Sequence, residues 1–326
     1  MKGKVLQLLN NADDYISGEE ISNKLGVSRT AIWKVMNQLR DKGYEIESVT
    51  RKGYRLLSSP DILNEAEIKY DLKSKLIGKK VITFDSIDST NKYGKKIALE
   101  GEEEGTVIIS EEQKAGKGRR GRNWVSPPRE GIWMSIILRP NTAPENASMI
   151  TLVAGLAVCK AIREITSLEA MIKWPNDIVI NGKKICGLLT EMNSEIDFIN
   201  FVIVGIGINV NISKFPSELK EIATSLLLEG NGPYNRKIIV KRTIELFEDY
   251  YNTYLKTEDL TNIIDEYNDY CININRKVQV ISKKENILGT VKNVTKKGEL
   301  IVTNSNGDDM IVTSGEVSVR GLYGYV

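Results

Sequence analysis

The chain has 326 residues, of which 41% are hydrophobic and 27% charged, and its formal net charge is +2. This length predicts about two or three domains with buried cores. Because the net charge is small, any nucleic-acid binding must come from a local basic patch. The sequence contains no histidine, which excludes His-dependent hydrolases and His-ligated metal sites. If the chain is an enzyme, its chemistry must depend on carboxylates, lysines, arginines, backbone amides or Mg²⁺.

The sequence indicates neither a secretion signal nor a membrane segment. Residues 1–4 (MKGK) lead straight into an amphipathic stretch, and no apolar run reaches the length of a membrane span. Cys159, Cys186 and Cys271 are widely spaced, which argues against a disulfide framework or a zinc site. We therefore expect a cytoplasmic chain that has no membrane partner.

Residues 1–60 carry the pattern of a winged helix-turn-helix domain. Apolar residues recur at helical spacing in three short stretches, Ser17 and Ser28 are suitable N-caps, and Gly26 ends the helix between them. The alternating residues 44–49, a turn and a returning strand follow, which predicts a hairpin wing. A small helical bundle without a DNA function is the alternative.

The outer face of the second helix in this pair favours DNA binding. It carries basic, hydroxyl, amide and indole groups, which are types that contact phosphates and base edges. Residues 1–60 contain ten Lys/Arg and seven Asp/Glu, a net charge of only +3, so we expect weak binding by a monomer and therefore a dimer. The candidate DNA-binding residues, from this helix and the wing turn, are Ser28, Arg29, Thr30, Trp33, Lys34, Asn37, Arg51 and Lys52.

Two further segments follow after a short linker. Residues 65–270 mix helical and strand patterns, and they include a continuous apolar strand at residues 201–210. We interpret Gly205 and Gly207 in that strand as points of close backbone approach. Residues 271–326 contain only strand and turn patterns, which predicts a small β-barrel.

A basic loop rich in glycine lies at residues 114–122. It contains the letters G-x-G-x-x-G, and an apolar strand at residues 106–110 leads into it, as in dinucleotide-binding folds. Pro127 and Pro128 exclude the helix that such folds require, and the loop carries five cations and no acid. The loop alone leaves two interpretations: a solvated surface segment, or a cationic loop whose backbone amides approach an anion.

Several motifs occur together in a fixed order. They are residues 88–91 (DSTN), 113–124 (QKAGKGRRGRNW), 173–177 (KWPND), 182–191 (GKKICGLLTE), 205–210 (GIGINV) and 314–320 (SGEVSVR). In this order they resemble the bacterial biotin–protein ligases, and the loop and the KWPND block are highly specific in combination. With its winged N-terminus the chain resembles the bifunctional type, which is also a repressor of the biotin operon. The resemblance covers essentially the whole chain.

The resemblance implies an α+β multidomain fold. Its parts are an N-terminal winged helix-turn-helix domain (1–60), a central α/β ligase domain with a mixed sheet (65–270) and a C-terminal SH3-like β-barrel (271–326). It also implies that biotin and MgATP give biotinyl-5′-AMP, which then acylates a lysine of a biotin carboxyl carrier domain. The implied ligands are biotin, ATP and Mg²⁺, and the implied partners are that carrier domain, operator DNA and a second copy of the chain when the adenylate is bound.

The resemblance also implies catalytic roles. Lys184 matches the lysine that bridges the biotin carboxylate and the α-phosphate, and Arg119 belongs to the loop that closes over the adenylate. Lys173 and Asp177 lie in the block beside the adenylate, and Asp177 is the candidate Mg²⁺ ligand. Position 117 is lysine where arginine is frequent in the family, which retains the charge but not a bidentate contact.

Motif positions further imply a set of ligand contacts. Trp124 matches a position that stacks on adenine, but it is also a plausible core residue, and Asn209 is equally a plausible strand-end residue. Ser89 and Thr90 suit a helix N-cap as well as a biotin contact. The candidate biotin- and nucleotide-binding residues are Ser89, Thr90, Asn91, Gln113, Gly116, Lys117, Gly118, Arg119, Arg120, Trp124, Lys184, Gly187, Asn209 and Arg320.

Two other functions compete with a ligase that is also a repressor. One is a transcription factor whose central domain binds a small acid without chemistry; the intact loop, Lys184 and Asp177 argue against it. The other is a lipoyl-type acyl ligase on a related scaffold. The GRRGR loop and the N-terminal winged helix-turn-helix domain favour biotin over lipoate as the substrate.

Overall fold

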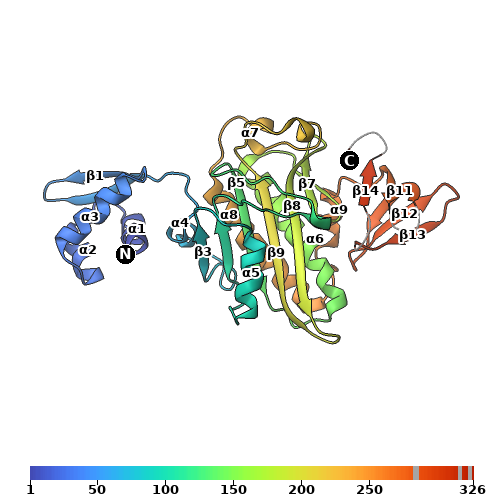
Figure 1. The fold of residues 1–326 in the computed structure, drawn as a ribbon, viewed down its shortest axis with the longest axis horizontal. Helices are drawn as coiled ribbons and strands as arrows, with labels where there is room; N and C mark the ends of the chain where they lie inside the picture. The colour runs from blue at the N-terminus through green and yellow to red at the C-terminus, as the bar shows by residue number, and fades with distance from the viewer. Residues whose placement is uncertain (282–285, 315–317, 322–324) are drawn as a thin grey trace. The chain divides into compact units, whose positions relative to one another are not determined.

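A computed structural model describes residues 1–281, 286–314, 318–321 and 325–326 of the chain (Figure 1). It divides into two compact units, Met1–Leu72 and Lys73–Val326. Residues 315–317 of the motif near the C-terminus lie outside the described part. None of the helices in the described ranges is long and apolar enough to span a bilayer.

The N-terminal unit has the predicted helix-turn-helix elements. Ser17 Oγ accepts a hydrogen bond from Glu20 N at 3.0 Å, and Ser28 Oγ accepts one from Ala31 N at 3.2 Å, so both predicted N-caps are confirmed. Gly26 ends the intervening helix in the left-handed conformation, with φ of 63°. The elements are α1 (Lys2–Asn10), α2 (Gly18–Leu25), α3 (Arg29–Arg40), β1 (Glu45–Val49), β2 (Gly53–Ser58) and α4 (Glu65–Lys69).

One face of α3 packs into the core of this unit. Ile32, Val35, Met36 and Leu39 recur at helical spacing and are all buried, as predicted. The antiparallel strands β1 and β2 form the predicted hairpin. The opposite face of α3 therefore remains available for a partner.

A seven-stranded mixed sheet forms the centre of the second unit. Its order is β3-β4-β5-β9-β8-β7-β6, and only β3 and β4 pair in parallel, so the predicted mixed sheet is confirmed. The strands are β3 (Val81–Phe84), β4 (Val107–Ser110), β5 (Gly131–Leu138), β6 (Met171–Lys173), β7 (Asp177–Ile180), β8 (Lys183–Ser194) and β9 (Ile199–Asn209).

Helices cover this sheet. Phe201 and Ile203 of β9 pack with Ile97 of α5. Because side chains alternate along a strand, Gly205 and Gly207 lie on the same face of the sheet as Phe201 and Ile203, beyond the start of α5. Helix α6 packs against β8 and against α8. The helical elements are α5 (Thr90–Leu99), η1 (Arg119–Gly121), η2 (Pro144–Ser148), α6 (Met149–Thr166), η3 (Ser217–Leu219), α7 (Leu226–Glu229), α8 (Arg236–Thr257) and α9 (Ile264–Tyr270).

The last part of the chain is rich in β-structure, as predicted. Five strands in its described residues form an antiparallel sheet in the order β13-β12-β11-β10-β14. Trp174 is fully buried and donates from Nε1 to Gly298 O at 3.1 Å, which joins this region to the central sheet. The strands are β10 (Lys277–Ile281), β11 (Asn286–Val294), β12 (Leu300–Asn304), β13 (Asp309–Val312) and β14 (Ser318–Gly321).

A buried carboxylate on α8 fixes the first residues of the second unit. Glu248 is 7% exposed, and its two oxygens accept hydrogen bonds from the backbone N–H groups of Lys75, Leu76 and Ile77 at 2.6, 2.6 and 2.7 Å. Hydrogen bonds to a charged acceptor are stronger than those between neutral groups. This one side chain therefore holds the segment that leads into β3.

We predict that Glu248→Ala lowers the free energy of unfolding by about 3 kcal/mol, because each buried amide left without an acceptor costs roughly 1–3 kcal/mol. Urea denaturation monitored by circular dichroism measures this change. Asp249→Ala, at the exposed neighbouring position on α8, is the control and should change stability by less than about 0.5 kcal/mol. Equal stability of the two variants would contradict the role of Glu248.

Candidate functional site

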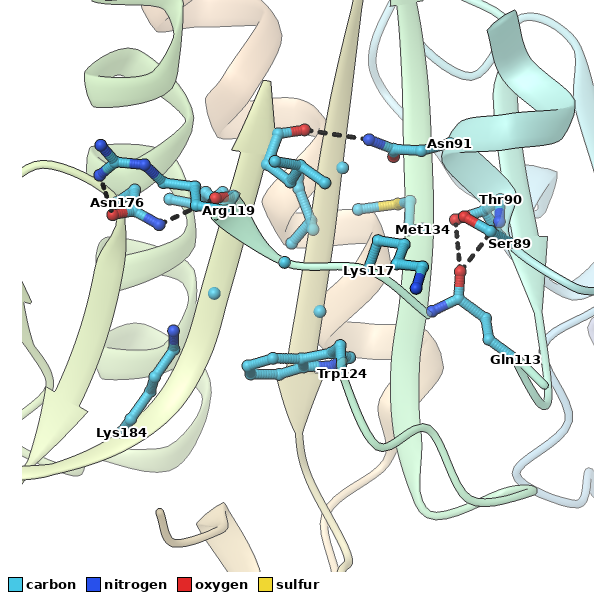
Figure 2. A pocket seen from close by; sticks show the side chains of 17 residues that line it. Ser89, Thr90, Asn91, Gln113, Lys117, Arg119, Trp124, Met134, Asn176 and Lys184 are labelled. Atoms are coloured by element: carbon cyan, nitrogen blue, oxygen red, sulfur yellow. Dashed lines mark hydrogen bonds between the residues drawn. The ribbon is translucent and has the colours of Figure 1, made fainter. Parts of the chain in front are cut away.

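A pocket opens on the α5 face of the central sheet (Figure 2). The space between its lining residues, open solvent included, is about 450 Å³. The residues come from the start of α5, the glycine-rich loop, and strands β5, β8 and β9. They are Ser89, Thr90, Asn91, Gln113, Lys117, Gly118, Arg119, Trp124, Met134, Asn176, Lys184, Gly187, Leu188, Leu189, Gly205, Ile206 and Gly207.

One end of the pocket is polar and uncharged. Ser89 is the N-cap of α5, as predicted, and its hydroxyl accepts a hydrogen bond from Lys92 N at 3.4 Å. Gln113 Oε1 accepts two hydrogen bonds from Thr90, one from the backbone N–H at 2.9 Å and one from the side-chain hydroxyl at 3.1 Å (Figure 2). Gln113 Nε2 donates to Ser126 Oγ at 3.0 Å. These side chains hold one another in place before any ligand arrives.

The floor of the pocket is bare backbone under an indole ring. Gly187 of β8 pairs with Gly207 of β9, and Trp124 lies over both. A Cβ added to Gly207 would lie 2.6 Å from Trp124 Nε1, and one added to Gly205 would lie 2.3 Å from Asn91 Oδ1. The prediction of close backbone approach at Gly205 and Gly207 is therefore confirmed. Trp124 Nε1 has no hydrogen-bond partner among the described residues.

The other end of the pocket is cationic. Lys184 Nζ lies 2.5 Å from Asp177 Oδ1 and 5.1 Å from the centroid of the Trp124 ring. The second oxygen of Asp177 accepts a hydrogen bond from the Tyr325 hydroxyl. One carboxylate thus orients both an ammonium group and the phenol of a residue near the C-terminus.

Lys173 lies next to this ion pair. It is 5% exposed, and its Nζ is 3.2 Å from the centroid of the Tyr325 ring. Burial lowers the pKa of Lys173 to about 8, although the charge of Asp177 opposes this shift. Burial also raises the pKa of Tyr325, and the charge of Asp177 raises it further, so the phenol stays protonated and donates to Asp177.

The basic loop is folded against the pocket. Arg119 donates from Nη1 to Asn176 Oδ1 at 2.8 Å, as Figure 2 shows. It also donates from Nη2 to Ser314 O at 2.8 Å. Burial lowers the pKa of Arg119. Gly118 N donates to Arg122 O at 2.7 Å, which closes a tight turn. No helix begins at the end of this loop, where η1 is followed by extended backbone, so the dinucleotide-fold interpretation is excluded.

Most of the predicted ligand contacts meet in this one pocket. The predicted residues among its lining are Ser89, Thr90, Asn91, Gln113, Lys117, Gly118, Arg119, Trp124, Lys184 and Gly187. Sequence reasoning did not assign Met134, Asn176, Leu188, Leu189 or Ile206 to the site. Of these residues, Asn176 could have been predicted, because it lies in the KWPND motif at residues 173–177. The apolar residues carry no signal that separates them from ordinary core residues.

The other predicted site residues lie outside the lining. Asp177 contacts the lining residue Lys184 directly, and Lys173 packs on the ring of Tyr325, which donates to Asp177. Asn209 is buried and donates from Nδ2 to Thr224 O at 3.0 Å, a contact that suits the strand-end role given as its alternative. The remaining predicted residues outside the lining are Gly116, Arg120 and Arg320. Arg320 is exposed on β14, and its charge lowers the pKa of Lys173.

The described residues contain no group of three or more acidic or cysteine side chains that could by themselves hold a metal ion. Asp177 is the carboxylate that contacts Lys184, so a divalent ion there would need most of its ligands from elsewhere. Mg²⁺ suits such an arrangement, because it commonly takes one or two carboxylates and otherwise phosphate oxygens and water.

The predicted DNA-binding residues lie on one helix and the wing turn of the N-terminal unit. Trp33 is 54% exposed, unusual for a large apolar side chain. Asn37 is half-buried and its Oδ1 accepts a hydrogen bond from Arg40 at 3.2 Å, which limits its freedom to read a base. The exposed members of the set are Ser28, Arg29, Thr30, Trp33, Lys34, Arg51 and Lys52.

Each of the two units matches the profile of a known protein family or domain. The profile of the Biotin/lipoate A/B protein ligase family matches residues 83–209, and that of an HTH domain matches residues 2–55. In structure, the chain is similar to the biotin protein ligase from Aquifex aeolicus in complex with biotin and ATP, with a TM-score of 0.67 and 28% identity over 74% of this chain and 99% of that one.

Two relatives match almost end to end. The Bifunctional ligase/repressor BirA of Escherichia coli (strain K12) is 30% identical over 97% of this chain and 96% of its own length. The Bifunctional ligase/repressor BirA of Bacillus subtilis (strain 168) is 39% identical over 94% of this chain and 95% of its own length. This similarity spans the DNA-binding unit, the pocket and the C-terminal strands together, and the chain therefore belongs to the family of bifunctional biotin ligase/repressors.

Proposed function

We propose that this chain activates biotin with ATP, transfers it to a lysine of a biotin carboxyl carrier domain, and represses transcription by binding operator DNA. The observation that carries the enzymatic part is one pocket that has a neutral polar end, an aromatic ring over a glycine floor, and a cationic end. A biotin molecule has the matching sequence of groups: a cyclic urea, an apolar chain and a carboxylate.

In the first step, a carboxylate oxygen of biotin attacks the α-phosphorus of ATP, and pyrophosphate leaves. This displacement needs positioned cations and no protein nucleophile. Lys184 keeps two of its three ammonium protons beyond the bond to Asp177, and these bridge the biotin carboxylate and the α-phosphate. Arg119 and Lys117 on the loop neutralise the remaining phosphate charge.

In the second step, the neutral ε-amine of the carrier lysine attacks the acyl carbon of the mixed anhydride. An amide bond forms, the acyl–phosphate bond breaks, AMP leaves with the bonding electron pair, and the amine loses a proton. Trp124 stacks on the adenine, and its N–H, which has no partner in the described part of the chain, provides a donor at the pocket wall. Arg320 lies close enough to Lys173 to contribute positive charge near the nucleotide.

Mg²⁺ is the expected partner of the triphosphate, and it neutralises phosphate charge when bound. Asp177, beside Lys184, is the residue that would hold the ion, together with oxygens of the bound nucleotide. We further propose that the C-terminal strands fold as an SH3-like barrel, and that the adenylate-bound chain forms a homodimer. A dimer presents two recognition helices to two half-sites, which offsets the low net charge of each N-terminal unit.

Two observations favour this function over its alternatives. A transcription factor that only senses a small acid has no need for Lys184 and Asp177 in contact at the edge of the pocket. A lipoyl ligase has no use for a site lined by Thr90, Gln113 and Asn91, because the dithiolane ring of lipoate forms no strong hydrogen bonds. The relatives named above are ligase/repressors, which agrees with both points.

We predict that Lys184→Ala lowers the rate of biotinyl-AMP formation by about 10²–10³-fold, the usual effect of removing one such electrostatic group. Biotin-dependent pyrophosphate release measures the rate, and circular dichroism checks the fold. Lys183→Ala is the matched control, since the neighbouring ammonium donates to Lys220 O outside the pocket, and it should keep near-normal activity. Similar activities of the two variants would remove Lys184 from the mechanism.

We predict that changing Lys34 and Arg51 together to Ala weakens operator binding and leaves ligation unchanged, because the two side chains lie in the N-terminal unit. The slope of log K against log salt should fall by about one unit for each DNA phosphate that the protein no longer neutralises. Fluorescence anisotropy with a duplex selected from a random-sequence pool measures binding. Changing Lys4 and Lys69 to Ala removes the same charge from α1 and α4 and serves as the control; equal weakening in the control would contradict the assignment.

We predict that biotin and ATP together tighten operator binding, because the adenylate promotes the dimer. By linkage, operator DNA must then tighten binding of the adenylate by the same factor in affinity. Sedimentation velocity with and without both ligands measures the dimer, and anisotropy measures DNA affinity. Operator affinity that stays the same with and without biotin and ATP would show that the DNA-binding unit is not regulated by the ligase site.

A further inference from the structure

Arg119 is the cation of the basic loop that turns inward. It is half-buried, whereas the four other cations of residues 114–122 are exposed. A charged group that leaves water needs hydrogen-bond acceptors to replace it. Arg119 has two, Asn176 Oδ1 and Ser314 O, each at 2.8 Å. Both acceptors are distant from the loop in sequence, so the position of this guanidinium depends on residues outside the loop.

The side chain of Asn176 is oriented by its own neighbours in the sheet. Its Nδ2 donates to Leu188 O at 3.0 Å and to Asp177 Oδ1 at 3.3 Å. A carbonyl oxygen has no proton, and Asp177 is the carboxylate that forms the ion pair with Lys184, so both acceptors require the NH₂ group of the amide. The amide oxygen is therefore directed away from them, and it accepts the hydrogen bond from Arg119 (Figure 2).

The backbone of Asn176 is attached to the same strand. Leu188 N donates to Asn176 O at 2.9 Å, and Asn176 Nδ2 donates back to Leu188 O. Asp177 and Gly187 are the adjacent pair in the ladder between β7 and β8, so these two bonds continue the ladder by one position. Asn176 thus has a rigid base in the central sheet, and it transmits that rigidity to Arg119 on the loop.

We propose that Asn176 is a positioning residue that fixes the guanidinium of Arg119 at the pocket, and that it thereby prolongs the stay of a bound acyl-adenylate. Arg119, Asn176 and Lys184 line the same end of the pocket (Figure 2). Two acceptors on two different nitrogens fix both the direction and the plane of a guanidinium, whereas one acceptor leaves it free to rotate. The inference rests on the proposed function for the identity of the ligand.

Asn176 also contacts Asp177, but this contact is the weaker route to the ligand. At 3.3 Å it is the longest of the three hydrogen bonds made by the amide, and the bond from the charged Arg119, at 2.8 Å, is the shortest. Asp177 Oδ1 is held by Lys184 at 2.5 Å whether or not the amide is present. Loss of the Asn176 amide therefore leaves the ion pair in place and affects Arg119, which keeps the bond to Ser314 O.

The test measures how fast labelled biotinyl-AMP leaves the full chain when excess unlabelled biotinyl-AMP is added. Asn176→Leu keeps the size of the side chain and removes its hydrogen bonds, while the backbone bond from Leu188 N remains. We expect dissociation to be about 5-fold faster or more, the scale of losing one hydrogen bond to a charged group. Arg119→Ala should have a larger effect, because Asn176→Leu leaves the bond to Ser314 O.

A double-mutant cycle separates positioning from structural damage. In the Arg119→Ala background, Asn176→Leu should change the dissociation rate by less than about 2-fold, because the group that it positions is gone. Asn268→Leu is the matched control: this half-buried amide also holds a strand backbone, with Val294 N and O at 2.8 and 3.2 Å. It should release the adenylate within about 2-fold of the wild-type rate. Asn176→Ala is measured in parallel, and circular dichroism checks each fold.

Three results would overturn the proposal: wild-type dissociation rates in both folded Asn176 variants, the same acceleration by Asn176→Leu with and without Arg119, or an equal acceleration in Asn268→Leu. A wild-type chain that does not bind biotinyl-AMP at all would instead overturn the proposed function. The two failures are therefore distinguishable in the same assay.

Discussion

The absence of side chains at neighbouring positions of β8 and β9 is the constraint on which the pocket depends. Gly187 and Gly207 form a cross-strand pair of bare backbone, so the Trp124 ring lies flat on the sheet. Gly205, two residues earlier on the same face, gives Asn91 its place. A methyl group at Gly205 or Gly207 would displace a pocket side chain. The strand that forms the centre of the sheet therefore also determines the shape of the ligand site.

Charge around this floor is organised by very few side chains. Asp177 is shared by Lys184 and Tyr325, and Lys173 packs on the Tyr325 ring, so one carboxylate organises two lysines. The surrounding groups remain cationic, which suits a triphosphate and not a neutral ligand. The opposite end is neutral, and its side chains form hydrogen bonds with one another. A molecule with a neutral polar head and an anionic tail finds both environments in one pocket.

Features that depend on neighbours in sequence were predictable, and features that depend on distant contacts were not. Ser17 and Ser28 cap helices through residues three positions away, and the prolines after the loop exclude a helix by local sterics. The sequence motifs predicted most of the residues that line the pocket. They also included Asn209, which bonds Thr224 instead of lining the pocket. Tyr325 could not be anticipated, because it meets Asp177 across nearly half the chain.

The placement of Trp124 makes the ligand site optically distinct within the second unit. The other two tryptophans of that unit, Trp133 and Trp174, are fully buried, and both indole N–H groups already donate to carbonyl oxygens. Trp33 belongs to the N-terminal unit and is largely exposed. Only the indole of Trp124 combines contact with the pocket and, among the described residues, an N–H without a partner. The pocket thus has an intrinsic fluorophore in its wall, whose emission should respond to a bound ligand without any attached label.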